Sequence, residues 1–409
     1  MKRCTLVLAL ATFMVCGFTL LSPAATFKIG DIDWSLGGSV RLDAGYQFSD
    51  LGDQALISSS SLLTYPEDSQ TDFFLENPGN SRIRLKAQYD EMIGYVEVGL
   101  DSSKVKLRHA YAKYDMDDEY SLLVGQTYSI TAEESAALRL NKDNGLAGVG
   151  NLDLSRNPMI CFTRCAGNLT FKFAIEDNDV LTPSGLDESK YVVNQLTPAI
   201  LARIDYENDM MRITPSILWQ RYEMKGNAYG LSNIQYKDIN VSGWVIALDS
   251  EFKLEQVRFQ YECWYGQNIA VFAGIDKRPR HSTDFGAPVA RTPVAGDAST
   301  DIEDVKSFGG WGQFKIPLDP VTVYLGAGYQ QADVEPEDQT KKPYYESEIS
   351  TWGAFINCKY NLVKGFYIQP EVAYFNWGND APKTPEDHKT GDNDLGSDIF
   401  VGVHFQYDF

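Results

Sequence analysis

The sequence predicts an all-β fold, a transmembrane antiparallel β-barrel of sixteen strands. Three observations predict it. Apolar and polar residues alternate along most of the chain, short and long connections follow one another in turn, and aromatic residues gather near segment ends. Successive side chains of a strand point to opposite faces, so alternation gives each strand one oily and one wet face. After residue 25 no apolar run is long enough for a membrane helix.

Two stretches show the alternation most completely, residues 34–48 and residues 399–409. The first is long for a globular strand but suits a tilted membrane strand with an extramembrane end. Similar segments recur along the chain, and we expect one strand from each. Their ranges are 34–48, 81–89, 92–101, 104–115, 119–129, 158–165, 168–176, 197–206, 210–222, 238–251, 253–266, 307–317, 320–333, 347–362, 365–377 and 396–409.

Short and long connections alternate along the chain. Each even-numbered segment is followed by a few residues, as at Asp90-Glu91, and each odd-numbered one by a long stretch, except at Ser102-Ser103. Transmembrane barrels have short turns on one rim and long loops on the other. A soluble sandwich or propeller has no reason to sort its loops in this way, so the connections favour a membrane barrel.

Aromatic residues lie near the expected strand ends, where a membrane barrel carries its two interfacial girdles. The alternative is the ordinary preference of aromatic residues for strands. Taken with the parity of the connections, the girdle interpretation is favoured. The positions are Tyr46, Phe48, Tyr89, Tyr114, Tyr128, Tyr206, Trp219, Tyr222, Tyr265, Tyr360, Tyr374 and Trp377.

Residues 1–25 are expected to be a secretory signal peptide, which leaves 26–409 as one barrel domain. Lys2 and Arg3 supply the positive start, an apolar run follows, and Ser-Pro-Ala-Ala at 22–25 is a small-residue cleavage region. Without Lys2 and Arg3, 34 basic residues face 56 acidic ones, a formal charge of −22. Such a chain is a poor nucleic-acid binder.

Four cysteines follow the signal segment, too few and too scattered for a disulfide framework. They are Cys161, Cys165, Cys263 and Cys358. Cys161 and Cys165 stand four residues apart on one expected strand, roughly 13 Å, which is too far for a disulfide. We therefore expect four unpaired thiols.

The end of the chain resembles the assembly signal of outer-membrane barrels, with Phe405, Tyr407 and Phe409 in alternation. That resemblance implies the barrel assembly machinery as a partner. RLKA at 84–87, GYVEV at 94–98, LRHAY at 107–111, LLVGQTYS at 122–129 and SRNPMI at 155–160 resemble trimeric porins of the DcaP-like family. This second resemblance covers residues 81–165 and the last strand. It implies a homotrimer of sixteen-stranded barrels and a third loop, here 130–157, folded inward as a constriction.

The sequence gives little support for catalysis. Hydrolytic sites need a nucleophile or carboxylate positioned beside a histidine, and only four histidines are present. His109 falls on the apolar face of its segment, so we expect it at a subunit contact or the membrane interface. His404 is expected to face the lumen without a motif that marks a partner, and His281 and His388 fall in connections. We predict that the protein is not an enzyme.

Charged residues are expected on the inner face of the second, third and fourth segments. Adjacent strands lie about 4.8 Å apart, so they form one patch with a basic excess of four: Arg82, Arg84, Lys86, Glu97, Asp101, Lys104, Lys106 and Arg108. One interpretation is that these residues form ion pairs with one another and only stabilise the barrel wall and the loop. The other is a basic wall that opposes acidic residues of the third loop and sets up a transverse field. Those acidic residues are Glu133, Glu134, Asp143 and Asp153.

No cofactor is expected. Acidic residues in the first and last long connections either form a solvated surface, which we favour, or bind calcium or magnesium that bridges to lipopolysaccharide. They are Asp50, Asp53, Glu67, Asp68, Asp72, Glu76, Asp392, Asp394 and Asp398.

These features predict an outer-membrane porin through which small hydrophilic solutes diffuse. Mild anion selectivity is expected, because salt screens the acidic loops more than the basic wall. The first alternative is a substrate-specific channel for anionic solutes such as dicarboxylates or phosphate. A barrel enzyme and a surface adhesin are the others. The polar inner face expected for a water-filled pore comprises Arg41, Asp43, Gln47, Arg203, Arg258, Gln260, Glu262, Gln369 and Glu371.

Overall fold

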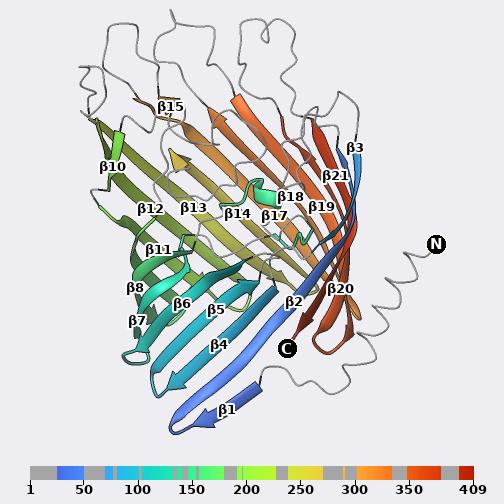
Figure 1. Ribbon diagram of the computed structural model, residues 1–409, viewed down its shortest axis with the longest axis horizontal. Coiled ribbons are helices and arrows are strands. Elements are labelled where there is room, and N and C mark those ends of the chain that lie inside the picture. Colours follow the sequence, from blue (N-terminus) through green and yellow to red (C-terminus); the bar gives the residue numbers. More distant parts are fainter. Residues whose placement is uncertain are drawn as a thin grey trace, which may run out of the picture.

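The chain forms a closed antiparallel β-barrel with sixteen strand positions (Figure 1). The computed structural model describes residues 25–49, 70–76, 81–100, 104–131, 136–140, 146–152, 156–178, 191–195, 197–226, 238–269, 289–290, 302–333, 348–378 and 396–409. Except for Ala25, the expected signal peptide lies outside the described residues.

Pairing between the first and last strands closes the barrel. β2 (Ile32–Ser49) pairs along one edge with β4 and β3 and along the other with β21. Every other neighbouring pair is also antiparallel. The remaining wall strands are β3 (Gln70–Glu76), β4 (Ser81–Tyr89), β5 (Met92–Leu100), β6 (Val105–Asp115), β7 (Tyr120–Tyr128), β8 (Arg156–Ala166), β9 (Leu169–Glu176), β10 (Tyr191–Asn194), β11 (Ala199–Glu207), β12 (Met211–Gly226), β13 (Ile239–Leu254), β14 (Val257–Gln267), β17 (Lys306–Leu318), β18 (Val321–Asp333), β19 (Glu348–Val363), β20 (Phe366–Asn376) and β21 (Ser397–Asp408).

All sixteen segments expected from the alternation are strands, so the fold class is confirmed. The structure adds short strands to them. β3 pairs with β2 beyond the end of β4, and β10 pairs with β12 beyond the end of β11, so each lengthens an expected strand position. β1 (Ala25–Ile29) forms a hairpin with β2, and a separate pair joins β15 (Val289–Ala290) to β16 (Ile302–Glu303).

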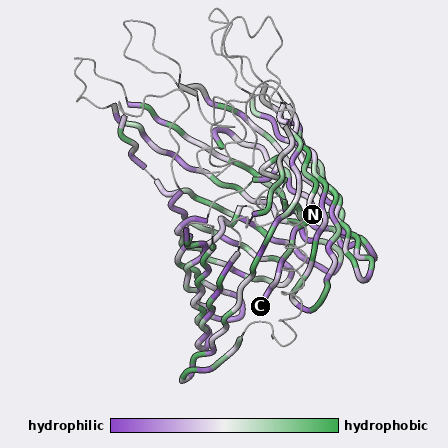
Figure 2. The backbone as a smooth tube through the Cα atoms, turned by 45° about the vertical axis from the view of Figure 1, so that its right-hand side comes forward, coloured by the Kyte–Doolittle hydropathy of each residue, from purple (hydrophilic) through white to green (hydrophobic). Residues whose placement is uncertain are grey.

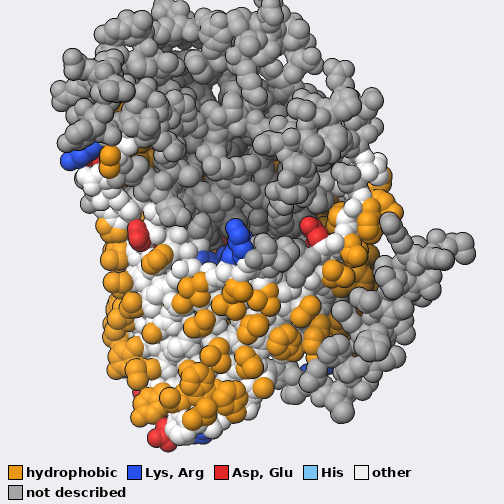
Figure 3. All heavy atoms as spheres, in the orientation of Figure 1, with side chains coloured by type: hydrophobic (Ala, Val, Ile, Leu, Met, Phe, Trp, Pro, Cys, Tyr) orange, Lys and Arg blue, Asp and Glu red, His pale blue; other side chains and the backbone are white. Residues whose placement is uncertain are grey.

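The alternation of the sequence becomes an inside-out distribution of side chains. The tube in Figure 2 changes between green and purple along the strands. Outward positions expose large apolar side chains, as at Val105 (69%) and Ile246 (52%), whereas inward positions bury polar ones, as at Asp43 (0%) and Glu371 (2%). Orange apolar atoms cover much of the wall in Figure 3. This outer face suits contact with hydrocarbon rather than water.

The short connections among the described residues all lie at one rim of the barrel. Examples are the turn between β4 and β5 and the turn between β19 and β20. The wall above that rim is uneven in height. β4 to β9 are eight to eleven residues long, whereas β12, β13 and β19 have sixteen. Figure 1 shows the short strands as a low wall at the lower left. Among the described residues, no helix has the length and apolar character to cross a membrane.

Candidate functional site: the inner wall and the loop against it

Three arginines of the predicted basic wall converge on one carboxylate. Glu97 accepts hydrogen bonds from Nε of Arg84 and of Arg108, each at 2.8 Å, and Nε of Arg82 lies 3.6 Å away. Tyr95 Oη lies 3.2 Å from the same carboxylate. The side chain of Glu97 is only 4% exposed, against 35% for Arg84. The ion pairing that we considered therefore exists, and it leaves the cluster with more positive than negative charge.

The remaining residues of that prediction are placed less fully. Lys86 lies opposite Ser35 and Lys106 opposite Gly99, both on the inner face, and Lys104 precedes β6. Asp101 and the four loop acids Glu133, Glu134, Asp143 and Asp153 lie outside the described residues. Within the described part of the chain, the structure thus brings the arginines together, and the opposing acidic loop stays a prediction.

A β-bulge at Arg108 changes the expected position of His109. Glu97 pairs with His109 and Val98 pairs with Leu107, so Arg108 is the extra residue of the bulge. From His109 onward, the residues that strict alternation would place on the outer face of β6 therefore point inward. His109 is 8% exposed and pairs through Nδ1 with Thr127 Oγ1 at 3.0 Å. The expectation that it lies on the apolar outer face was wrong, because simple alternation does not count an inserted residue.

The loop following β7 contacts the inner wall at Ile130 and Thr131, whose carbonyls accept from Arg203 and Ser216, and again at residues 136–140. The amide of Ala137 donates to Gln313 Oε1 at 2.8 Å, and its carbonyl accepts from Asn357 and Gln369 at 2.8 and 3.0 Å. Leu138 and Leu140 are fully buried. They belong to an apolar cluster with side chains of the wall, including Trp311, Phe355, Phe375 and Phe400.

The buried carboxylate of Glu371 binds the backbone of the same loop segment. Its two oxygens accept from the amides of Arg139 at 2.8 Å and Leu140 at 2.9 Å, and Asn357 Nδ2 donates to it at 2.9 Å. Glu371 was expected only as part of a polar lining. Here it is 2% exposed and satisfies backbone donors that would otherwise be buried without partners.

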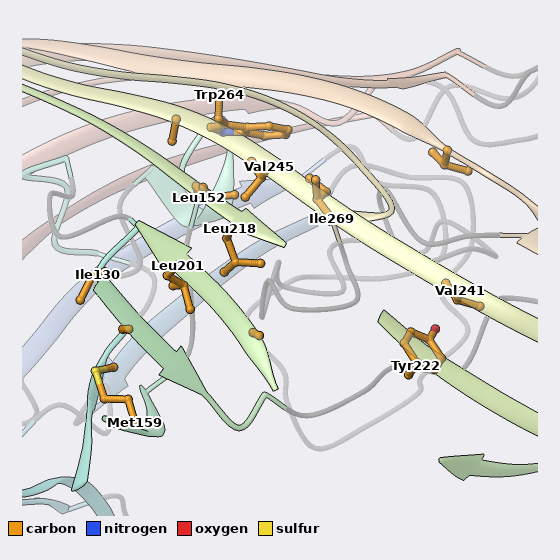
Figure 4. Packing of buried hydrophobic residues seen from close by; sticks show 14 of the residues in the cluster. Ile130, Leu152, Met159, Leu201, Leu218, Tyr222, Val241, Val245, Trp264 and Ile269 are labelled. Carbon is orange, nitrogen blue, oxygen red and sulfur yellow. The ribbon is translucent and has the colours of Figure 1, made fainter. Parts of the chain in front are cut away.

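A second contact holds residues 149–152 against β14 and β18. Leu152 donates to Glu262 Oε1 at 2.6 Å, and Gly150 donates to Gln330 Oε1 at 3.1 Å and accepts from Trp264 Nε1 at 3.0 Å. A Cβ at Gly150 would lie 2.1 Å from the carbonyl oxygen of Gly310, so only glycine allows this approach. Figure 4 shows Leu152 near Trp264 and Val245.

His404 has a partner that the sequence did not mark. Its Nδ1 lies 2.5 Å from Asp43 Oδ1, and both side chains are fully buried between β21 and β2. Gln406 Oε1 approaches the other ring nitrogen at 3.2 Å. A signal was available, since barrel closure makes the first and last strands neighbours. Because neither group is exposed to solvent, a solute does not reach this pair.

The structure describes all four expected thiols and some of the candidate metal ligands. The cysteines at 161, 165, 263 and 358, all among the described residues, are not joined by disulfide bonds. Among the described ranges, no group of three or more His, Cys, Asp or Glu side chains could hold a metal ion. Most of the acids considered for calcium or magnesium lie outside those ranges. Asp398 is described, and it accepts from Gln47 and Trp377 at 2.8 Å each.

Comparison with solved structures identifies the architecture. The outer membrane channel DcaP of Acinetobacter baumannii is similar at a TM-score of 0.65 and 18% identity, over 94% of this chain and all of that one. The chain has the porin fold. The anion-selective porin from Comamonas acidovorans matches at 0.57 and 12% identity, over 92% and 100%. OmpT of Vibrio cholerae in its trimer form matches at 0.51 and 11%, over 92% and 99%.

Sequence comparison adds nothing to this structural likeness. No protein-family model matches the chain. No curated protein sequence matches it either. At these identities the likeness to solved porins establishes the fold, and the function is argued from the wall and the loop.

Proposed function

We propose that the protein is an outer-membrane porin that lets small hydrophilic solutes diffuse through a water-filled barrel. The observation that carries the proposal is the closed sixteen-position barrel with an apolar outer face and a polar inner face. An apolar exterior favours a lipid environment, and a polar interior favours water and dissolved solutes. Export with a cleaved signal peptide and contact with lipopolysaccharide complete the proposal.

Single-channel recording of the refolded protein in a planar bilayer tests this function. We expect stable, ion-conducting steps without any added substrate. A correctly folded barrel without conductance would contradict the proposal and favour a surface adhesin. Hydrolytic activity lost on His404→Ala would favour an enzyme, but the full burial of His404 and Asp43 argues against that outcome.

The loop at 130–157 is proposed to narrow the pore. Support comes from its contacts with the wall at Ala137–Leu140 and at Gly150–Leu152, which involve side chains of β14 and β17 to β20. Ile130 and Thr131 add contacts with β11 and β12. Its buried leucines suit a segment packed on protein rather than one exposed to water. The cluster around Glu97 lies on β4 to β6, a different part of the wall.

A homotrimer is also proposed. The low wall formed by β4 to β9 exposes apolar side chains on its outer face, including Val105 (69%), Leu107 (51%) and Phe173 (51%). Such a face suits either lipid or a second copy of the chain. OmpT of Vibrio cholerae, which shares the fold, has been described as a trimer. Triplet closures in the recordings would support three pores in one particle.

Mild anion selectivity is proposed because three arginines share one carboxylate at the inner wall. At about 0.15 M salt the Debye length is roughly 8 Å, so distant acidic loops are screened while charges on the wall act directly on a passing ion. A channel specific for dicarboxylates or phosphate is the second candidate, favoured by the same arginines because guanidinium groups bind such anions in a bidentate manner.

The selectivity is tested by changing Lys104→Glu, Lys106→Glu and Arg108→Gln together. We expect the zero-current potential in a KCl gradient near 0.15 M to move from chloride preference to potassium preference. The control is Lys28→Glu, Lys364→Glu and Arg164→Gln, an equal change of charge at exposed positions of the opposite rim. If the wild type prefers potassium and the wall variant leaves that unchanged, these residues do not control permeation.

A further inference from the structure

A cavity of about 790 Å³ lies on the inner face of the low wall, near the rim of short turns. Two register rows across β6 to β9 define it. Lys113 lies opposite Leu123 and Leu123 opposite Cys161, and in the next row Ser121 lies opposite Thr163. The neighbouring outward residues of these strands are the exposed apolar ones, which places the cavity inside the barrel. Its volume suits a small organic molecule.

One side of the cavity, its base, is apolar. Leu123, Ile130, Met159 and Cys161 form it. Ile130, Met159 and Cys161 are 4–5% exposed and belong to the larger apolar cluster of Figure 4, which labels the first two. Water makes few favourable contacts with such a surface. The hydrocarbon part of a solute is stabilised when it leaves water and packs against this surface.

The mouth of the cavity is acidic. Both of its lysines are already paired, Lys113 with Asp115 at 2.6 Å and Lys172 with Asp205 at 3.4 Å. The β6–β7 turn then contributes Asp117, Asp118 and Glu119, whose charges face a single arginine at 4.0 Å from Glu119. Arg203 also binds Asp205, at 2.6 Å, so the whole group has an excess of one negative charge. The turn by itself has an excess of two, so this end of the cavity favours a positively charged group.

We propose that this cavity binds small organic ammonium ions with an apolar tail, the tail on the base and the ammonium group at the turn carboxylates. The arginine cluster around Glu97, which attracts anions, meets the lining of the cavity at Tyr128, where Arg108 donates to the hydroxyl at 3.2 Å. The turn carboxylates lie at the other end of β7. This inference rests on the proposed function in one respect: solutes reach the cavity through the pore. An amphipathic cation would therefore be retained on the wall while small anions pass, so the protein would bind one class of solute and conduct another.

Calorimetry on the refolded, detergent-solubilised protein tests the site with n-butylammonium, n-hexylammonium and hexanoate. We expect n-hexylammonium to bind up to about fifteenfold more tightly than n-butylammonium, the equivalent of about 0.8 kcal/mol for each of the two added methylenes. Hexanoate should bind at least several-fold more weakly than n-hexylammonium. Equal affinity for the two amines, or for hexanoate and n-hexylammonium, would overturn the proposal.

Two variants with the same change of charge separate the mouth from the rest of the rim. Asp118→Asn with Glu119→Gln should weaken n-hexylammonium binding several-fold. Asp209→Asn with Glu255→Gln, in two other short turns, should leave it unchanged. Equal effects of both would show general attraction to the rim and overturn the site. Because binding is measured without a membrane, a missing conductance would count against the porin function and not against this site.

Discussion

Replacing Glu371 by alanine is expected to release the loop from the inner wall and to make the open channel noisy. The change removes the acceptor for the amides of Arg139 and Leu140 and for Asn357 Nδ2. A buried donor without a partner costs about 1–3 kcal/mol, and 1.4 kcal/mol corresponds to a factor of ten. The time spent in partly closed states should therefore rise about tenfold or more, measured by single-channel recording.

Glu251→Ala is the matched control. Glu251 is a nearly buried glutamate of the inner wall, and its carboxylate binds Arg258 and Gln260 within the wall rather than the loop. It should leave the channel as quiet as the wild type. Equal noise in both variants would indicate a general loosening of the barrel, and a quiet Glu371→Ala channel would mean that this carboxylate does not hold the loop.

Phe409→Asp is expected to lower the amount of assembled protein in the outer membrane about tenfold or more, with synthesis and export unchanged. Phe409 exchanges two backbone hydrogen bonds with Gly38, at 2.8 and 3.1 Å, at the seam between the first and last strands. Its ring stacks on Tyr407 with the centroids 6.2 Å apart. A carboxylate here would remove the apolar end of the alternating tail, where a charge near lipid is costly.

The control for this experiment is Tyr89→Asp, which places the same charge at an exposed aromatic position at the end of β4. Membrane fractions quantified by immunoblotting should show a much smaller loss for the control. Phe409→Trp should restore assembly because it keeps an apolar ring. Normal levels of Phe409→Asp would count against the reading of residues 405–409 as an assembly signal.

The sequence by itself determined the strands and their faces. Alternation is a local property with a period of two, so it marked all sixteen wall positions and most of their ends within a few residues. It failed where local pattern is weak or interrupted. β3 has three consecutive apolar residues, Phe73 to Leu75, and β10 has only four residues, while the bulge at Arg108 reversed the face of His109.

For the candidate site, the sequence placed the arginines on one face but could not say how their charges would be shared. Alternation assigned Glu371 and Glu262 to a polar lining, but it did not show that they accept hydrogen bonds from the loop backbone. The partners Glu371 and Leu140 are 231 residues apart, and Asp43 and His404 are 361 apart. Closure of the barrel brings the second pair within hydrogen-bond distance, and the path of the loop along the inner wall brings the first. Alternation fixes which face a side chain takes, whereas its partner depends on strand register and on the path of the loop, which only the tertiary structure decides.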